Sequence, residues 1–206
     1  MSDLTADAER SRAAKLALRN RMLTVRRSLT PSARLAAARQ LQDQILALVR
    51  REHPSIVAAY VPVGPEPGGT DLPARLAATG VRVLLPVLLP DNDLDWASFE
   101  GSLVPGRRGL SEPTGERLGV EAVASAGLIL VPALAVDRAG HRMGRGGGSY
   151  DRALARTVAP AVALLHDGEL IDEVPAEPHD RPVHGAITPR DGFVALPLSR
   201  GVEWTK

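Results

Sequence analysis

Four short apolar runs constrain the fold of this chain more than any other feature of its sequence. They cover residues 55–61, 81–85, 127–131 and 161–165. Short runs of this kind, closed by Pro or Gly, are typical of strands buried on both faces of a parallel sheet. Predicted helices lie within the first and second pairs of runs, so right-handed strand-helix-strand units are expected. The sequence therefore predicts an α/β fold with a largely parallel, Rossmann-like open sheet flanked by helices.

The whole chain, residues 1–206, is predicted to form a single domain with a helical N-terminal part, 1–52, before an α/β core, 53–206. Residues 6–29 are rich in Ala, Arg and Leu, and residues 31–51 keep apolar side chains at helical spacing. Thr30 followed by Pro suits the N-cap and first position of the second helix. We expect these two helices to lie antiparallel or crossed.

The remaining elements are predicted from weaker patterns. Helices are expected at residues 71–79 and 149–157, where apolar side chains recur at helical spacing. Residues 94–99 alternate like a half-exposed strand, and residues 186–188 have room for a short strand in a proline-rich tail. The long segment between 90 and 119 is otherwise expected to be loop.

The balance of charge argues against two classes of partner. With 25 Lys and Arg against 24 Asp and Glu, the formal net charge is +1, so no overall field favours nucleic acid or an anionic membrane. The absence of cysteine removes disulfides, thiolate nucleophiles and cysteine-based zinc sites. The start lacks an apolar leader, and no segment approaches the roughly 20 apolar residues of a membrane span. We expect a soluble, cytoplasmic protein whose anion sites are local.

One local anion site is predicted at the glycine-rich stretch GRGGGS, residues 144–149, directly before a predicted helix. Glycines let backbone N–H groups approach a ligand, and the helix start points to the same place. Arg142 and Arg145 add charge suited to forked contacts with phosphate. The pattern lacks both the Lys-Ser/Thr ending of a P-loop and the third glycine of a dinucleotide fingerprint. It predicts a phosphate-binding loop, and the alternative is a sharp packed turn.

One carboxylate, Asp151, suggests a metal near this loop, although it has an alternative role to be weighed. Asp151 is placed to hold a hard cation such as Mg²⁺ beside substrate phosphates, or it caps the helix in whose first turn it lies. Asp180 lies in the proline-rich tail, where no helix needs a cap. His166, His179 and His184 lack the spacing of a helical metal pair, which argues against zinc.

Five segments resemble one known family in residue type and in order. They are KLALR at 15–19, AYVPVGPE at 59–66, LSEP at 110–113, VPALAVDRAGHRMGRGGGSYDR at 131–152, and HDRPV at 179–183 with ITP at 187–189. They resemble the 5-formyltetrahydrofolate cyclo-ligase family, also called methenyltetrahydrofolate synthetases. The resemblance implies ATP- and Mg²⁺-dependent conversion of 5-formyltetrahydrofolate, with or without a polyglutamate tail, to 5,10-methenyltetrahydrofolate. ADP and phosphate are released, and a phosphorylated formyl group is the intermediate.

The resemblance also implies roles for individual residues. Without it, Lys15 and Arg19 would be a solvated helix face, and Glu66 an ordinary loop carboxylate. With it, Lys15 and Arg145 are the catalytic cations and Asp151 and Asp180 the metal ligands. The implied ATP-binding set is Lys15, Arg19, Arg142, Gly144, Arg145, Gly146, Gly147, Gly148, Ser149 and Tyr150. The implied substrate-binding set is Arg19, Tyr60, Glu66, Gly147 and Tyr150.

The chain departs from the family pattern at three places, and two other functions stay open. Ser149 stands where the family often has a second Tyr, His184 where many members have Asp, and residues 67–70 replace an acidic pattern. A non-catalytic nucleotide- or phosphate-binding module is possible on the same sheet, because fold does not fix function. A sugar-phosphate isomerase on a similar sheet would need neither ATP nor Mg²⁺.

Overall fold

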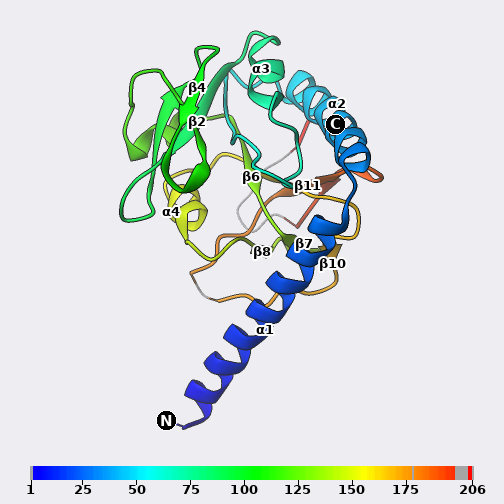
Figure 1. Ribbon diagram of the computed structural model, residues 1–206. Coiled ribbons are helices and arrows are strands. Elements are labelled where there is room, and N and C mark those ends of the chain that lie inside the picture. The colour runs from blue at the N-terminus through cyan, green and yellow to red at the C-terminus, as the bar shows by residue number, and fades with distance from the viewer. Residues whose placement is uncertain (1, 178, 198–203, 206) are drawn as a thin grey trace.

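A seven-stranded sheet lies at the centre of the computed structural model, which describes residues 2–177, 179–197 and 204–205 (Figure 1). Its strand order is β12-β11-β9-β6-β1-β2-β3. The inner neighbours β11, β9, β6, β1 and β2 pair in parallel, whereas β3 and β12 pair antiparallel at the two edges. All four predicted buried strands belong to this sheet, so the predicted fold class is confirmed. The strands are β1 (Ile56–Ala58), β2 (Arg82–Leu88), β3 (Leu94–Ser98), β6 (Leu128–Pro132), β9 (Ala161–Leu164), β11 (Gly185–Thr188) and β12 (Gly192–Ala195).

The two N-terminal helices are α1 (Ser2–Ser28) and α2 (Pro31–Glu52). The predicted cap of α2 is confirmed, because the Thr30 side chain accepts a hydrogen bond from the backbone N–H of Ala33. Figure 1 shows the helices meeting at a bend near Thr30 and continuing in different directions, so the antiparallel alternative is wrong. In the described part of the chain, no helix has the length and apolar character required to cross a membrane.

Alternating strand residues feed two hydrophobic layers, one on each face of the sheet. On one face, Leu41 and Ile45 of α2 and Leu76 of α3 (Leu72–Ala77) pack over β1 and β6. On the other face, α4 (Ser149–Ala155) and the 3₁₀ helix η2 (Val120–Ser125) supply Leu154 and Val123. Both faces are therefore covered, which explains why the strands read as continuous apolar runs and not as alternating ones.

Strand β2 runs through Pro86 to Leu88, so the prediction that it ends at residue 85 is wrong. The N–H of Phe99 donates to the carbonyl of Val83, and the N–H of Leu89 donates to that of Asp93. The backbone N–H and C=O groups of odd-numbered residues in β2 therefore point to β3. The nitrogen of Pro86, an even-numbered residue, points to the other edge of β2, where β1 lies. Partner strand β1 ends opposite Leu84, so the missing N–H of proline leaves no ladder bond unmade.

The glycine-rich loop does not follow the central strand β6 directly. Two further strands, β7 (Ala135–Asp137) and β8 (Arg142–Met143), form an antiparallel hairpin between β6 and the loop. Asp137 closes this hairpin, because its Oδ1 accepts the N–H groups of Ala139 and His141. The hairpin carries the loop away from the main sheet, and β10 (Leu170–Ile171) pairs in parallel with β7.

A second small sheet was read from the sequence as loop. Strands β4 (Leu103–Pro105) and β5 (Ser111–Pro113) pair antiparallel around the 3₁₀ helix η1 (Arg107–Gly109). Glu112 is buried, and its Oε1 accepts the backbone N–H of Leu88 at 3.3 Å. The LSEP motif therefore fixes this small sheet to the end of β2.

Candidate functional site

A cavity of about 580 Å³ opens where the chain changes direction across the sheet. The chain moves from β1 to β2 on one side and from β6 to β9 on the other, so the neighbours β1 and β6 form a switch point. In open α/β sheets, ligands bind beyond the carboxyl ends of the strands at such a point. Tyr60 and Val61 after β1, and Ala133 and Leu134 after β6, line the cavity here. Its volume is that of a pocket for a small molecule or cofactor.

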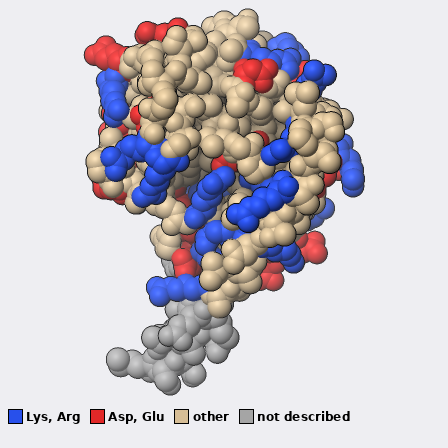
Figure 2. Space-filling view, viewed as in Figure 1, with Lys and Arg blue, Asp and Glu red and all other residues tan. Residues whose placement is uncertain are grey.

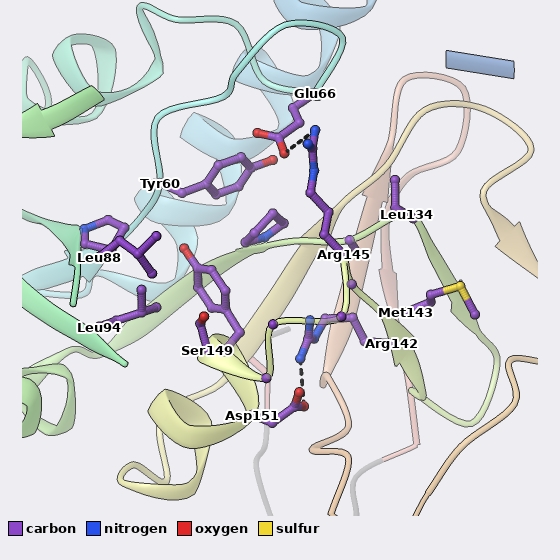
Figure 3. A pocket seen from close by; sticks show the side chains of 18 of the residues that line it. Tyr60, Glu66, Leu88, Leu94, Leu134, Arg142, Met143, Arg145, Ser149 and Asp151 are labelled. Carbon is purple, nitrogen blue, oxygen red and sulfur yellow. Dashed lines mark hydrogen bonds and ion pairs between the residues drawn. The ribbon is translucent and has the colours of Figure 1, made fainter. Parts of the chain in front are cut away.

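The cavity has a cationic side and an apolar side. Figure 3 shows Leu88 and Leu94 at one side and Arg142 and Arg145 at another. On the molecular face drawn in Figure 2, Lys and Arg side chains gather across the middle with Asp and Glu among them. Although the chain carries a formal charge of only +1, its cations are thus locally concentrated.

The glycine loop requires glycine at two positions for geometric reasons. Gly146 has φ 94° and Gly148 has φ 69°, a region that L side chains rarely adopt. A Cβ on Gly146 would also lie 3.2 Å from Nη2 of Arg19, so the loop and helix α1 approach closely there. Arg19 Nε donates to the carbonyl of Gly144 at 3.2 Å. The loop is therefore a turn packed against α1 as well as part of the cavity wall.

Lys15 reaches the cavity from helix α1 and contacts two carboxylates there. Its Nζ lies 2.8 Å from Oδ2 of Asp180 and 3.1 Å from Oε2 of Glu177. Burial alone would raise the pKa of Asp180, but the hydrogen bonds from Lys15 and from the Glu177 backbone outweigh it, and the pKa lies below its usual value. The Lys15 side chain is mostly buried, so the alternative that it belongs to a solvated helix face is wrong.

The second predicted metal ligand, Asp151, contacts a predicted phosphate ligand. Arg142 Nη2 donates to Asp151 Oδ1 at 2.8 Å (Figure 3). The backbone N–H of Arg181 donates to the same oxygen at 3.1 Å. Helix α4 begins after Gly148, and no side-chain cap hydrogen bond is formed there. Asp151 therefore makes no capping hydrogen bond, and the capping alternative retains only the favourable effect of its negative charge in the first turn of α4.

In the described part of the chain, Glu177, His179 and Asp180 bring three ligand atoms within 4.8 Å of one another. The two carboxylates suit a hard cation such as Mg²⁺, which takes oxygen ligands, whereas the imidazole does not. Asp151 is not part of this group. The sequence analysis identified Asp180 but not Glu177. The short spacing between Glu177, His179 and Asp180 in the tail is the pattern that indicates Glu177.

Glu66 lies on the loop after β1 and faces the glycine loop across the cavity. Its Oε1 is 3.0 Å from Nη2 of Arg145 (Figure 3). Its Oε2 accepts the backbone N–H of Val63. More than half of the Arg145 side chain is exposed, so this ion pair is weak and readily exchanged. Arg145 is therefore free to turn toward an anion that enters the cavity.

Two tyrosines lie beside Glu66 and stay neutral. Burial, followed by the negative charge of Glu66, raises the pKa of both Tyr60 and Tyr150 above the usual value. The hydroxyl of Tyr60 donates to the carbonyl of Pro67 at 2.9 Å. The hydroxyl of Tyr150 is buried and has no hydrogen-bond partner among the described residues. It is available as a donor or acceptor to a ligand.

The structure brings the predicted site residues together from four distant segments. Every one of them lines the cavity: Lys15, Arg19, Tyr60, Glu66, Arg142, Gly144, Arg145, Gly146, Gly147, Gly148, Ser149, Tyr150, Asp151 and Asp180. Sequence reasoning missed the apolar wall, including Leu88, Leu94 and Leu110, because an apolar residue near a strand is usually core. It also missed Arg26, which no sequence pattern separates from the solvated arginines of α1.

Comparison with known proteins agrees with this geometry. The family model described as the 5-formyltetrahydrofolate cyclo-ligase family matches residues 11–189. A 5-formyltetrahydrofolate cyclo-ligase of Mycolicibacterium smegmatis is 44% identical over 190 residues, covering 88% of this chain and 97% of the relative. One of Escherichia coli is 29% identical over 171 residues, covering 80% and 94%.

Among solved structures, the NMR structure of a 5,10-methenyltetrahydrofolate synthetase of Aquifex aeolicus is similar with a TM-score of 0.75 and 25% identity. The similarity covers 92% of this chain and 96% of that one. The family match spans every segment that builds the cavity, from α1 to the tail that carries Asp180. This chain therefore belongs to the 5-formyltetrahydrofolate cyclo-ligase family and is an enzyme of the ligase class.

Proposed function

We propose that this cyclo-ligase uses ATP and Mg²⁺ to convert 5-formyltetrahydrofolate to 5,10-methenyltetrahydrofolate, with release of ADP and phosphate. The observation that carries the proposal is the division of one cavity into a cationic side and an apolar side. A triphosphate and a reduced pterin ring need these two surfaces next to each other. Family membership makes the folate the substrate to test first.

The chemical problem in this conversion is that an amide oxygen leaves poorly. In the proposed first step the formyl oxygen attacks the γ-phosphorus of ATP, the bond to ADP breaks, and an imidoyl phosphate forms. Such a transfer asks a protein mainly for positioning and for positive charge around the transferred group. Lys15 and Arg145, each now paired with a carboxylate, are the mobile cations for it. Arg19, Arg142 and the loop amides complete the ATP site.

Magnesium is proposed to be held by carboxylate oxygens at the cationic side, where it would neutralise phosphate charge. Asp180 and its neighbour Glu177 supply two such oxygens close together. Asp151 makes both of its hydrogen bonds through Oδ1, so Oδ2 is the oxygen that it offers. When phosphate draws Lys15 away, the carboxylates that it contacts become available to a cation.

The second step closes the ring, and here the chain is proposed to position the substrate. Nitrogen N10 attacks the formyl carbon, the bond from that carbon to oxygen breaks, phosphate leaves, and N10 loses its proton. Glu66 and Tyr60 are proposed to hold the pterin or the formyl region, and Tyr150 to form part of the wall that ATP and the folate share. Leucines 88, 94 and 110 exclude water, which would hydrolyse the phosphorylated intermediate.

The test is a direct assay with three omissions. Purified protein is mixed with MgATP and 5-formyltetrahydrofolate, and the near-ultraviolet band of the methenyl product is followed together with ADP release. We expect product only when protein, Mg²⁺ and ATP are all present. ATP that binds without turnover would indicate a binding module instead, and turnover without ATP and Mg²⁺ would exclude the proposed mechanism.

A further inference from the structure

Three titratable side chains are buried together next to the cavity and have no part in the proposed chemistry. Arg26 is 2% exposed, Glu169 2% and His166 6%. Buried charges are costly unless they are paired and hydrogen-bonded. Their position between helix α1 and the loop that bears Glu66 therefore calls for a physical explanation.

Arg26 and Glu169 form a two-armed ion pair that fixes helix α1 to the body of the protein. Arg26 Nε lies 2.6 Å from Glu169 Oε1, and Arg26 Nη2 lies 2.7 Å from Oε2. The same Nη2 donates to the carbonyl of Ala133, in the segment that lines the cavity after β6. A forked contact of this kind sets both distance and direction.

Glu169 also fixes the turn that carries His166. Its Oε2 accepts the backbone N–H of His166 at 2.8 Å, and its own N–H donates to the His166 carbonyl at 3.2 Å. Gly168, the third residue of the turn, has φ 84°, which glycine takes without steric cost. The backbone that carries the imidazole is thereby held from both ends of the turn.

The imidazole itself reaches the loop that bears Glu66. His166 Nε2 lies 2.9 Å from the carbonyl oxygen of Pro65, and since a carbonyl only accepts, Nε2 is the donor. Pro65 directly precedes Glu66 in the chain. The carbonyls of Pro67 and Gly68 on the same loop are bonded by side chains too, but His166 holds the residue adjacent to the carboxylate.

We propose that His166 is a positioning residue for Glu66. It links the loop that carries the Glu66 carboxylate to the Arg26–Glu169 pair, which holds helix α1. The inference rests on the proposed function, because it takes Glu66 to contact the folate. The hydrogen bond to Pro65 keeps Glu66 at a fixed distance from Lys15 and Arg19 on α1. Folate binding should therefore depend on the Nε2 donor, whereas ATP binding should depend on it much less.

Two substitutions separate the donor from mere packing. His166→Gln keeps an N–H group close to the place of Nε2, whereas His166→Met fills similar space without a donor. We expect His166→Met to raise the KM for 5-formyltetrahydrofolate roughly tenfold, the order expected for one buried hydrogen bond, and to change the KM for ATP less than about twofold. His166→Gln should stay close to the parent protein in both constants.

A double-mutant cycle with Glu66→Gln tests whether His166 acts through Glu66. If it does, His166→Met should add little to the KM of the Glu66→Gln protein, because coupled residues are not additive. Additive effects, an equal rise in both KM values, a KM for the folate that does not change, or a His166→Gln protein as impaired as His166→Met would each overturn the inference. Should His166→Met fail to fold, His166→Asn, whose amide is too short to reach Pro65, takes its place with the same expected pattern.

The parent protein distinguishes failure of this inference from failure of the proposed function. If the parent makes no methenyl product, the proposed function is wrong and the inference falls with it. If the parent is active and the variants do not show the expected pattern, the inference alone is wrong.

Discussion

The two sides of the cavity are built in different ways. The apolar side comes mainly from β2 and β3 of the main sheet, where Leu88 and Leu94 are buried and continuous with the core, with Leu110 added from the loop before β5. The cationic side comes from helix α1, the glycine loop and the proline-rich tail, which all lie outside that sheet. Its cations are already paired with carboxylates of the same cavity.

This difference separates shape from charge. A surface continuous with a packed core is rigid, so the apolar side is suited to recognise a ring by its shape. The ion pair between Arg145 and Glu66 is partly exposed and costs little to exchange, so the cationic side can release Arg145 to phosphate readily, whereas Lys15 leaves more buried carboxylates. Substitutions on the cationic side should therefore alter ATP use, and those on the apolar side should alter folate binding.

The largest loss is expected from Gly146→Val, on the cationic side. Valine at φ 94° is strained, and its Cβ would meet the guanidinium of Arg19. We expect no measurable ATP binding by calorimetry and no methenyl product. Gly80→Val, at the exposed and positive-φ end of α3 with open space around it, is the control for strain alone. If both variants bind ATP normally, the loop is only a packed turn.

Asp151→Asn should lose most turnover while it keeps its fold. Asparagine keeps the size and can still accept from Arg142, but it removes the negative charge offered to a cation. We expect turnover to fall by roughly a hundredfold, about 2.7 kcal/mol in the barrier, and to recover in part when Mg²⁺ is raised. Normal turnover at limiting Mg²⁺ would show that Asp151 is a structural partner of Arg142 and no metal ligand.

Lys15→Ala should weaken ATP use more than it weakens folding. A charge-assisted contact to phosphate contributes about 1.5–3 kcal/mol, so the KM for ATP should rise by about one to two orders of magnitude. Arg21→Ala, at an exposed position of the same helix, is the matched control and should change neither the KM for ATP nor the free energy of unfolding. An unchanged KM in Lys15→Ala would leave its contacts with Asp180 and Glu177 as its whole role.

The sequence predicted the parallel part of the sheet well because burial on both faces leaves a signal in each strand separately. It did not predict β7, β8 and β12, which are two to four residues long and too short for a periodic pattern. The proline that seemed to end β2 was misleading for a tertiary reason. Whether Pro86 interrupts a hydrogen-bond ladder depends on where β1 ends, and the residues around Pro86 carry no information about that.

The predicted site residues meet in one cavity, but the contacts between them were not predicted. Lys15, Glu66 and Asp180 were identified from motif resemblance, and each lines the cavity. That Lys15 contacts Asp180, 165 positions away, follows only from the docking of α1. The buried role of Arg26 likewise has no local signal, because an arginine on a helix that is rich in arginine reads as solvated.

A smaller effect is expected on the apolar side from Leu110→Ser. Leu110 lines the cavity and is only partly buried, so the chain should still fold. We expect the KM for 5-formyltetrahydrofolate to rise by about three- to tenfold, for loss of roughly 1 kcal/mol of apolar contact, with the KM for ATP unchanged. Leu118→Ser, at an exposed leucine in the next loop, is the control. A change in the KM for ATP instead would break the division between the two sides.

The smallest effect concerns acid stability, and it asks which side of the cavity is held more firmly by charge. Asp93, at the turn between β2 and β3, contacts Arg156 of the α4 C-cap through both oxygens, at 2.9 and 2.6 Å. The Arg156 hydrogen bonds are the main reason that the pKa of Asp93 lies below its ordinary 3.8, and burial opposes them only in part. Asp180 on the cationic side also has a lowered pKa, but there burial, the largest influence, opposes the Lys15 contact.

For both carboxylates the folded pKa is below the unfolded one, so the stability they contribute is complete above about pH 4 and is lost as the pH falls through the folded value. We expect the free energy of unfolding, measured with urea at pH 7, 4.5 and 3, to fall between the last two. Asp93→Asn should flatten this decline more than Asp180→Asn, because its contact with Arg156 uses two oxygens and joins α4 to the main sheet. The opposite order would mean that the Lys15 pair is the stronger attachment, and that the cationic side is less free to exchange its partners than its partial exposure suggests.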